Sequence, residues 1–129
     1  MIDEITIRPE RQEGFKEVFE LHSIAFGRNN EAKLVDALRK NRTAFVPKLS
    51  VVASCRDKII GHILFTIINI KSDNGNLHES LGLAPMAVRP EFQKCGVGGQ
   101  LIRTGLEVAK MLGFKSVIFF RARVLLSKI

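Results

Sequence analysis

The sequence predicts a single domain of the α/β (α+β) class, built on a mostly antiparallel, mixed β-sheet. The order of hydrophobic patterns reads strand, two helices, three strands, helix, strand. The last helix lies between two apolar strands, and such a connection normally makes the two strands parallel neighbours. A length of 129 residues suffices for one hydrophobic core and is too short for two domains.

The first strand and the first helix open the chain. Ile5–Pro9 alternates apolar and polar residues and stops at proline, which predicts a short strand. From Arg11 to about Gly27, apolar residues recur at helical spacing and predict an amphipathic helix that ends at the glycine. They are Phe15, Val18, Phe19, Ala25 and Phe26, with His22 among them.

A second helix is expected within Asn29–Asn41. Asn30 is its predicted N-cap, because a short polar side chain can accept a hydrogen bond from the first turn. Glu31 falls in that first turn, where an acid interacts favourably with the helix dipole. The helix also has two leucines on one face and two basic residues at its C-terminus: Leu34, Leu38, Arg39 and Lys40.

Three strands follow. Leu49–Cys55 and Ile59–Ile70 flank a short polar turn and predict a hairpin. The polar segment Lys71–Ser80 contains Asn-Gly and is interpreted as a loop or a hairpin tip. Leu81–Val88 is apolar on both faces, which predicts a strand in the middle of the sheet.

The C-terminal part contains one helix and one further strand. Gly99–Leu112 has an apolar stripe and is followed by Gly113 as a helix stop. The stripe consists of Leu101, Gly105, Ala109 and Leu112. Lys115–Phe120 is the fifth predicted strand, and the segment "RARVLLSKI" ends the chain.

Composition narrows the range of functions. The formal net charge of +7 permits an anionic partner, but the basic residues are scattered and the chain has no Trp or Tyr for base stacking, so nucleic-acid binding is not expected. The acidic start "MIDEITIRPE" lacks the features of a signal peptide, which favours a cytoplasmic protein. Cys55 and Cys95 lie far apart in no metal-ligand spacing, so no metal site is expected.

Glycines cluster at the start of the last predicted helix, in the stretch "EFQKCGVGG". A helix N-terminus presents unpaired N–H groups and a partial positive charge, and Gly96, Gly98 and Gly99 would let an anion approach the backbone. The spacing fits neither a Walker A loop nor a Rossmann loop. The alternative is a turn that only allows close packing of the helix on the sheet.

The segment around these glycines resembles the coenzyme-A-binding core of the GCN5-related N-acetyltransferases (GNAT). The family pattern Gln/Arg-x-x-Gly-x-Gly/Ala is matched by Gln93, Gly96 and Gly98, and "VRPEF" precedes it at the end of the fourth strand. The order of elements agrees from about Ile5 to Phe120. The resemblance implies the GNAT fold, with splayed fourth and fifth strands and helices on both faces of the sheet.

The same resemblance implies an acetyl-CoA-dependent N-acetyltransferase that acts by direct attack of a primary amine, on a small molecule or a peptide. Backbone groups of Met86, Ala87 and Val88 would bind the pantetheine arm, and an N–H of Met86 or Ala87 would polarise the thioester carbonyl. The pyrophosphate would be held by backbone N–H groups of Lys94, Cys95, Gly96, Val97, Gly98 and Gly99.

The chain departs from the family pattern after its fifth strand. Family members continue through a helix and two strands, and many carry there a tyrosine that protonates the departing thiolate. The chain contains no tyrosine, and the predicted domain, 1–129, is C-terminally incomplete with the last strands missing. Impaired activity follows, and the alternative function is a catalytically weak or inactive CoA-binding module.

The same departure would leave the fifth strand as an apolar sheet edge. Such an edge favours pairing with another chain, so a homodimer through this strand and the C-terminal tail is expected. In that dimer Arg121 and Arg123 would point to the opposite face from Ala122 and Val124. The competing arrangement is a tail that folds back on its own chain.

A few polar residues remain as candidates. Glu79 could deprotonate the amine through water, as a carboxylate does at this place in several relatives, or be a solvated loop acid. His62 and His78 are weaker candidate bases, and His62 is expected to be a half-buried structural histidine. Cys95 is expected to be non-catalytic. The first two helices cover the acceptor pocket in the family, which makes candidates of Asn29, Asn30 and Glu31.

Overall fold

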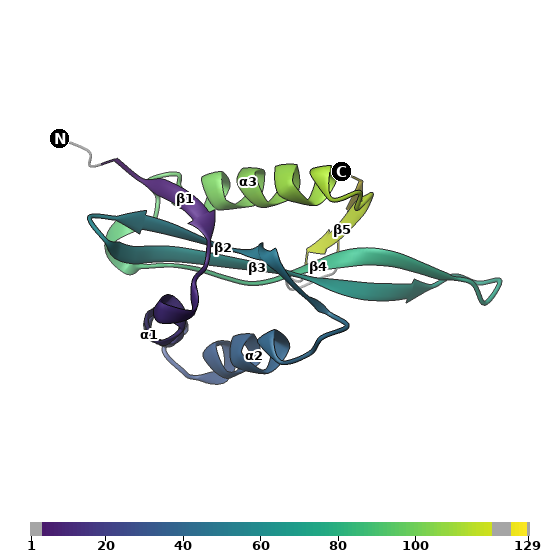
Figure 1. Cartoon of the computed structure of the whole chain (residues 1–129), viewed down its shortest axis with the longest axis horizontal. Coiled ribbons are helices and arrows are strands. Elements are labelled where there is room, and N and C mark those ends of the chain that lie inside the picture. The colour runs from purple at the N-terminus through teal and green to yellow at the C-terminus, as the bar shows by residue number, and fades with distance from the viewer. Residues whose placement is uncertain (1–3, 120–124, 129) are drawn as a thin grey trace.

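The computed structural model describes residues 4–119 and 125–128. A six-stranded sheet forms the middle layer, with α3 on one face and α1 and α2 on the other (Figure 1). The predicted α/β class and the helices on both faces are therefore confirmed. No helix in the described part of the chain is long and apolar enough to cross a bilayer.

The elements follow the predicted order with one addition at the end. The strands are β1 (Thr6–Pro9), β2 (Phe45–Cys55), β3 (Lys58–Lys71), β4 (Leu77–Val88), β5 (Ser116–Phe119) and β6 (Leu125–Lys128). The α-helices are α1 (Phe15–Phe26), α2 (Asn30–Arg39) and α3 (Val97–Met111), and the 3₁₀ turns are η1 (Gln12–Gly14) and η2 (Pro90–Phe92).

The sheet has the strand order β1-β2-β3-β4-β5-β6. All neighbours are antiparallel except β4 and β5, which are parallel from the pair Leu81–Val117 to the pair Leu83–Phe119. Helix α3 makes the crossover between them, as the sequence predicts. Both β3 and β4 are interior strands, and their buried side chains fill two apolar clusters, one beneath α3 and one beneath α1 and α2.

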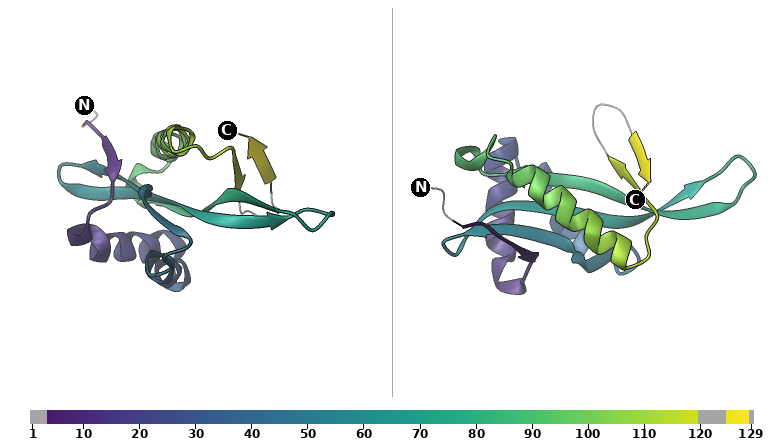
Figure 2. Two further views of the ribbon diagram at one scale, coloured as in Figure 1. Left: turned by 45° about the vertical axis from the view of Figure 1, so that its right-hand side comes forward. Right: turned by 90° about the horizontal axis from the view of Figure 1, so that it is seen from above.

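The β3–β4 hairpin is longer than predicted. Asn69 pairs with Glu79 and Lys71 pairs with Leu77, so the turn is confined to Ser72–Asn76. The segment Lys71–Ser80 is thus mostly strand with a hairpin tip, and this arm extends past the body of the sheet (Figures 1 and 2). Its polar composition reflects exposure of the arm to solvent, because ladder pairing needs no apolar side chains.

The N-terminal helices bury slightly different faces from those predicted. Helix α1 buries Leu21 together with Val18 and His22, while Phe26 is 41% exposed. Helix α2 buries Ala32 and Val35. Of the predicted pair, Leu38 packs against the same cluster, whereas Leu34 is 44% exposed. Both exposed side chains line a cavity described below.

The predicted N-cap of α2 was wrong by one residue. Asn29 occupies the cap position, Asn30 is the first helical residue, and no side chain caps the helix. The Oδ1 atom of Asn29 instead accepts a hydrogen bond from Ser23 Oγ at 2.7 Å, which ties the ends of the two helices together.

Helix α3 lies on the sheet through small residues. It buries Val97, Leu101, Gly105 and Ala109, whereas Leu112 follows the helix and is 42% exposed. A Cβ added at Gly105 would stand 2.1 Å from the Phe65 ring, so glycine is required here for close approach. Gly113 has φ +94° and ends the helix as predicted.

The C-terminal segment adds a sixth strand, in a stretch to which the sequence analysis assigned no element. Residues of β6 pair antiparallel with β5, from Ser116–Lys128 to Phe119–Leu125. The prediction that the fifth strand is a free edge was therefore wrong, and the competing arrangement, a tail folded back on its own chain, is confirmed (Figure 2). Phe120 and the predicted alternation over 121–124 lie outside the described residues, and the homodimer stays a prediction.

The contact between α3 and the sheet gives a first testable prediction. Gly105→Ala should lower the free energy of unfolding by roughly 1–3 kcal/mol, because overpacking against Phe65 outweighs the helix propensity of alanine, about 1 kcal/mol. Gly98→Ala in the same helix is the matched control, since its Cβ would meet no atom closer than 3.6 Å. Urea unfolding measures both, and equal stability of the two variants would contradict the tight contact.

Candidate functional site

A bulge interrupts the pairing of β4 with β3. Met86 pairs with Ile63 and Leu83 pairs with Phe65, so Ala84 and Pro85 together stand opposite a single residue of β3. Pro85 has no N–H for the ladder, which suits a bulge. A bulge bends the strand and redirects its side chains.

A cavity of about 390 Å³ lies beside this bulge. The bulge supplies one wall, α3 and β5 a second, and α1 and α2 a third. The lining residues are Leu83, Ala84, Pro85, Met86, Ile102, Phe119, Phe26, Glu31 and Leu34. The described β4–β5 pairing covers only Leu81–Leu83, so the cavity begins where that pairing stops. The splaying of the two strands beyond this point stays a prediction.

The predicted phosphate loop connects β4 to α3. The Nε2 group of Gln93 donates to the Val88 carbonyl at 3.0 Å and so fixes the loop on the end of β4. Lys94 and Gly96 have φ values of +64° and +83°, in the left-handed region. The first i→i−4 bond of α3 runs from Gln100 N to Gly96 O, and the N–H groups before it have no partner within the helix.

The sequence left two roles open for the loop glycines: an anion-binding loop, or a turn that only allows close packing of the helix. The space around these glycines distinguishes the two. Close packing of the helix on the sheet is achieved elsewhere, at Gly105 and at Gly61, where an added Cβ would lie 2.9 Å from Leu101. At Gly96 nothing lies within 4 Å of such a Cβ, and at Gly98 the nearest atom is Met86 Cε at 3.6 Å. The bare backbone therefore faces open space next to the bulge, and the residues fit a bound anion.

The structure brings most of the predicted ligand-binding residues together. Met86 lines the cavity, Ala87 is buried on the α1–α2 face of the sheet, and Val88 lies at the strand end beside Gly98. Lys94 and Cys95 are exposed in the loop, where Cys95 Sγ lies 3.6 Å from the Gln93 carbonyl and donates to it.

Two of the predicted candidates lie apart from the cavity. Glu79 and His78 are exposed on the hairpin arm, and neither lines the cavity. Glu79 is four positions before Leu83, roughly 13 Å along an extended strand. Its role in deprotonating the amine stays a prediction. Glu31, in contrast, lines the cavity.

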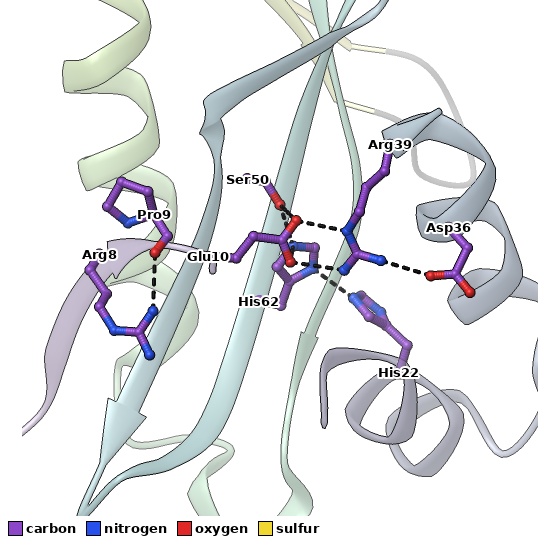
Figure 3. A network of polar contacts seen from close by, with 8 residues as sticks. All are labelled: Arg8, Pro9, Glu10, His22, Asp36, Arg39, Ser50 and His62. Carbon is purple, nitrogen blue, oxygen red and sulfur yellow. Dashed lines mark hydrogen bonds and ion pairs between the residues drawn. The ribbon is translucent and has the colours of Figure 1, made fainter. Parts of the chain in front are cut away.

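A buried polar network adjoins this site, and sequence reasoning missed most of it (Figure 3). Arg39 donates to both carboxylate oxygens of Glu10 at 2.8 Å and to Asp36 at 2.7 Å. Ser50 Oγ donates to Glu10 at 2.6 Å and lies 2.8 Å from His62 Nε2. These residues are spread over the chain in no recognisable motif, so no sequence signal could have joined them.

The network has a defined direction, which fixes the protonation of its two histidines. A hydroxyl has one hydrogen, and Ser50 gives it to Glu10, so Ser50 must accept from Nε2–H of His62. The neutral His62 ring then carries a lone pair on Nδ1, which accepts from His22 Nε2–H at 2.8 Å. The remaining lone pair, on His22 Nδ1, is buried without a hydrogen-bond partner.

Burial keeps both imidazole rings neutral. It lowers the pKa of His22 to about 4, with a further contribution from the Arg39 charge, while the charges of Glu31 and Glu10 act in the opposite direction. Burial, aided by His22 and Arg39, also holds the pKa of His62 well below its usual value. His62 is completely buried instead of half-buried as predicted, and its hydrogen bonds are those of a structural residue.

Comparison with known proteins identifies the class to which this fold and site belong. The chain belongs to the acetyltransferase (GNAT) family, whose model matches residues 15–124. It is 43% identical over 103 residues to the uncharacterized N-acetyltransferase YjhQ of Escherichia coli K12, which covers 78% of this chain and 55% of that protein. The N-acetyltransferase YhbS of the same strain is 27% identical over 94 residues, 73% of this chain and 53% of YhbS. The chain thus spans about half the length of these relatives.

Solved structures agree with the sequence comparison. A GNAT family acetyltransferase from Brucella melitensis, crystallised in complex with acetyl-CoA, matches with a TM-score of 0.86 and 28% identity over 99% of this chain and 90% of that chain. The E. coli YhbS structure in complex with CoA matches with a TM-score of 0.81 and 25% identity, over 93% of this chain and 64% of that one.

The buried histidines predict a loss of stability in acid. The ordinary histidine pKa is about 6.5, and that of His22 in the folded protein is about 4. Between these two pH values the unfolded chain binds a proton at His22 and the folded chain does not. The free energy of unfolding should therefore fall as pH drops through this range, by about 3 kcal/mol from His22 alone.

Urea unfolding at about pH 7.5 and about pH 4.5 measures this loss. His22→Gln should reduce the loss, whereas His78→Gln, at an exposed position, should leave it unchanged. The same loss in wild type and His22→Gln would show that the network does not exclude protons.

Proposed function

We propose that this chain is an acetyl-CoA-dependent N-acetyltransferase that transfers the acetyl group to a primary amine by direct attack. The observation that carries the proposal is the open N-terminus of α3, with its unobstructed Gly96 and Gly98, beside the cavity at the β4 bulge. Further support comes from membership of the GNAT family and from the acetyl-CoA and CoA in the crystals of two similar proteins.

In this proposal the backbone does most of the binding. The N–H groups at the start of α3 and in the loop from Lys94 hold the pyrophosphate, because a helix N-terminus favours negative charge. No acid stands in the first turn of α3 to oppose it. Backbone groups of Met86, Ala87 and Val88 bind the pantetheine arm along β4, which brings the thioester to the cavity.

The chemical step requires little from side chains. The lone pair of the neutral amine forms a bond to the acetyl carbonyl carbon, and the carbon–sulfur bond breaks with its electron pair on sulfur. The proton lost by the nitrogen passes to water or to the thiolate. An N–H of Met86 or Ala87 stabilises the negative charge that develops on the carbonyl oxygen, and one such donor can contribute about 3 kcal/mol. Holding the two reactants together supplies the rest.

The absence of tyrosine bears on the rate. A thiol with a pKa of roughly 8.5 gives a tolerable leaving group, so transfer can proceed without an acid. The second candidate is a CoA-binding module with weak or no activity, and the absent tyrosine is the observation that favours it. The two differ in turnover and share the same binding site.

The phosphate loop gives a third prediction. Gly98→Glu should weaken acetyl-CoA binding about 100-fold or more, because it places a negative charge beside the pyrophosphate. The fold should persist, since an acid in the first turn stabilises a helix by about 0.3–1 kcal/mol.

Isothermal calorimetry measures the affinity, and thermal unfolding monitors the fold. Lys110→Gln makes a charge change of the same sign at the far end of α3, where the side chain is exposed, and should leave the affinity unchanged. Tight binding by Gly98→Glu would remove the basis of the proposed function.

The fourth prediction concerns turnover. Without an acid for the thiolate, turnover should be about 10²–10⁴-fold slower than with one and should show no high-pH limb set by a tyrosine. A thiol-release assay across pH, with acetyl-CoA and a panel of primary amines, measures this. Binding with no turnover of any amine would favour the CoA-binding module, and fast turnover at neutral pH would show that another group replaces the acid.

A further inference from the structure

The cavity has two chemically different sides. Met86, Ile102 and Phe119 pack with the cluster beneath α3, on the side where the proposed function places the acetyl donor. Phe26, Glu31 and Leu34 come from α1 and α2, on the opposite face of the sheet. The amine acceptor must reach the thioester without displacing the donor, so the α1–α2 side is left for it.

The α1–α2 side combines apolar surface with one charge. Phe26 and Leu34 are 41% and 44% exposed, and both line the cavity, so they add to its continuous apolar surface, which a ligand can cover. Among the lining residues that the structure describes, Glu31 is the one that can ionise. Its side chain is 16% exposed.

The charges around Glu31 leave its carboxylate available to a cation. Arg28 donates to both oxygens, at 3.0 and 2.6 Å, and holds the pKa of Glu31 below its usual value. An ionised carboxylate has about four lone-pair sites, so further sites remain for a second donor. His22, which interacts electrostatically with Glu31, is neutral at pH 7 because burial lowers its pKa to about 4.

The side chain of Arg28 is 61% exposed, in contrast to that of Glu31. Solvent and salt therefore screen the Arg28 side of this bidentate pair. An arriving ammonium group can bind the remaining lone-pair sites of the carboxylate and compete with Arg28 for it.

From this arrangement we infer the acceptor class: a monoamine with an apolar body, of the alkylamine or arylalkylamine type, whose ammonium group binds Glu31 and whose body lies on Phe26 and Leu34. The inference rests on the proposed function. Glu31 determines specificity by holding the ammonium group. Before attack the ammonium group gives one proton to solvent water and becomes the neutral amine.

The same lining disfavours the multiply charged amines. Spermidine and the aminoglycosides carry several ammonium groups, and a desolvated cation without a partner is strongly unfavourable. Eight of the nine lining residues that the structure describes are apolar, so these residues offer no second carboxylate for a second charge. An apolar body, in contrast, gains from leaving water.

A pair of substitutions distinguishes this role from a structural ion pair. Glu31→Gln removes the ammonium site and should raise the KM for hexylamine about tenfold or more, with little change in kcat, by the loss of a charged hydrogen bond. Arg28→Gln removes the competitor and should lower that KM. A purely structural ion pair would shift both variants in the same direction, which would contradict the inference.

A homologous series tests the apolar side. From butylamine to hexylamine, kcat/KM should rise about fourfold for each methylene group that is buried. Leu34→Ser should flatten this dependence. Leu77→Ser is the matched control, because Leu77 is 66% exposed on the hairpin arm and does not line the cavity, and it should leave the slope intact.

The substrate panel comprises hexylamine, phenethylamine, spermidine and kanamycin, assayed with the full chain and saturating acetyl-CoA. We expect the two monoamines to exceed the polyamines in kcat/KM about tenfold or more, the discrimination due to one unpaired buried charge. Calorimetry with acetyl-CoA alone is run in parallel.

Two results would overturn the inference while the proposed function stands. One is tight acetyl-CoA binding with spermidine or kanamycin as the best substrate. The other is a kcat/KM that does not depend on the length of the alkyl chain of the amine. Tight binding with no turnover of any panel amine would overturn the inference and favour the CoA-binding module. Absence of acetyl-CoA binding would overturn the proposed function itself, and the inference with it.

Discussion

The buried ion pair between Glu10 and Arg39 joins helix α2 to the β-sheet. Their side chains are only 3% and 7% exposed, and charges so placed are tolerated only when they are paired and hydrogen-bonded. Glu10 follows β1 and Arg39 ends α2, so the pair fixes that helix on the sheet. The guanidinium also lies over the Phe15 ring of α1, 4.0 Å from its centroid.

From Glu10 the hydrogen bonds continue through Ser50 of β2 and His62 of β3 to His22 of α1 (Figure 3). The Glu10 carboxylate can only accept hydrogen bonds, so the direction of each bond in this series is set by the bond before it. The α1–α2 pair therefore has little freedom to slide over the sheet. Phe26, Glu31 and Leu34 owe their place at the cavity to this constraint, although none of them belongs to the network.

The opposite face is governed by packing. The closeness of α3 to the sheet, made possible by Gly105 and Gly61, brings the start of the helix next to Met86. The bulge at Ala84 and Pro85 then redirects β4 at the point where its pairing with β5 stops. The bare helix backbone and the irregular strand thus meet at Met86, which lines the cavity.

The sequence by itself determined what depends on neighbouring residues: the order of elements, the parallel crossover, the glycine-rich start of α3, and the family. These follow from hydrophobic periodicity and from a short motif whose residues lie close together in the sequence, from Gln93 to Gly98. Tertiary structure alone decided the polar network, since Glu10 and Ser50 are 40 positions apart and only pairing of β1 with β2 brings them into contact. It also decided that Leu34 faces the cavity and that the tail covers β5, because both depend on which surfaces remain free after the sheet has formed.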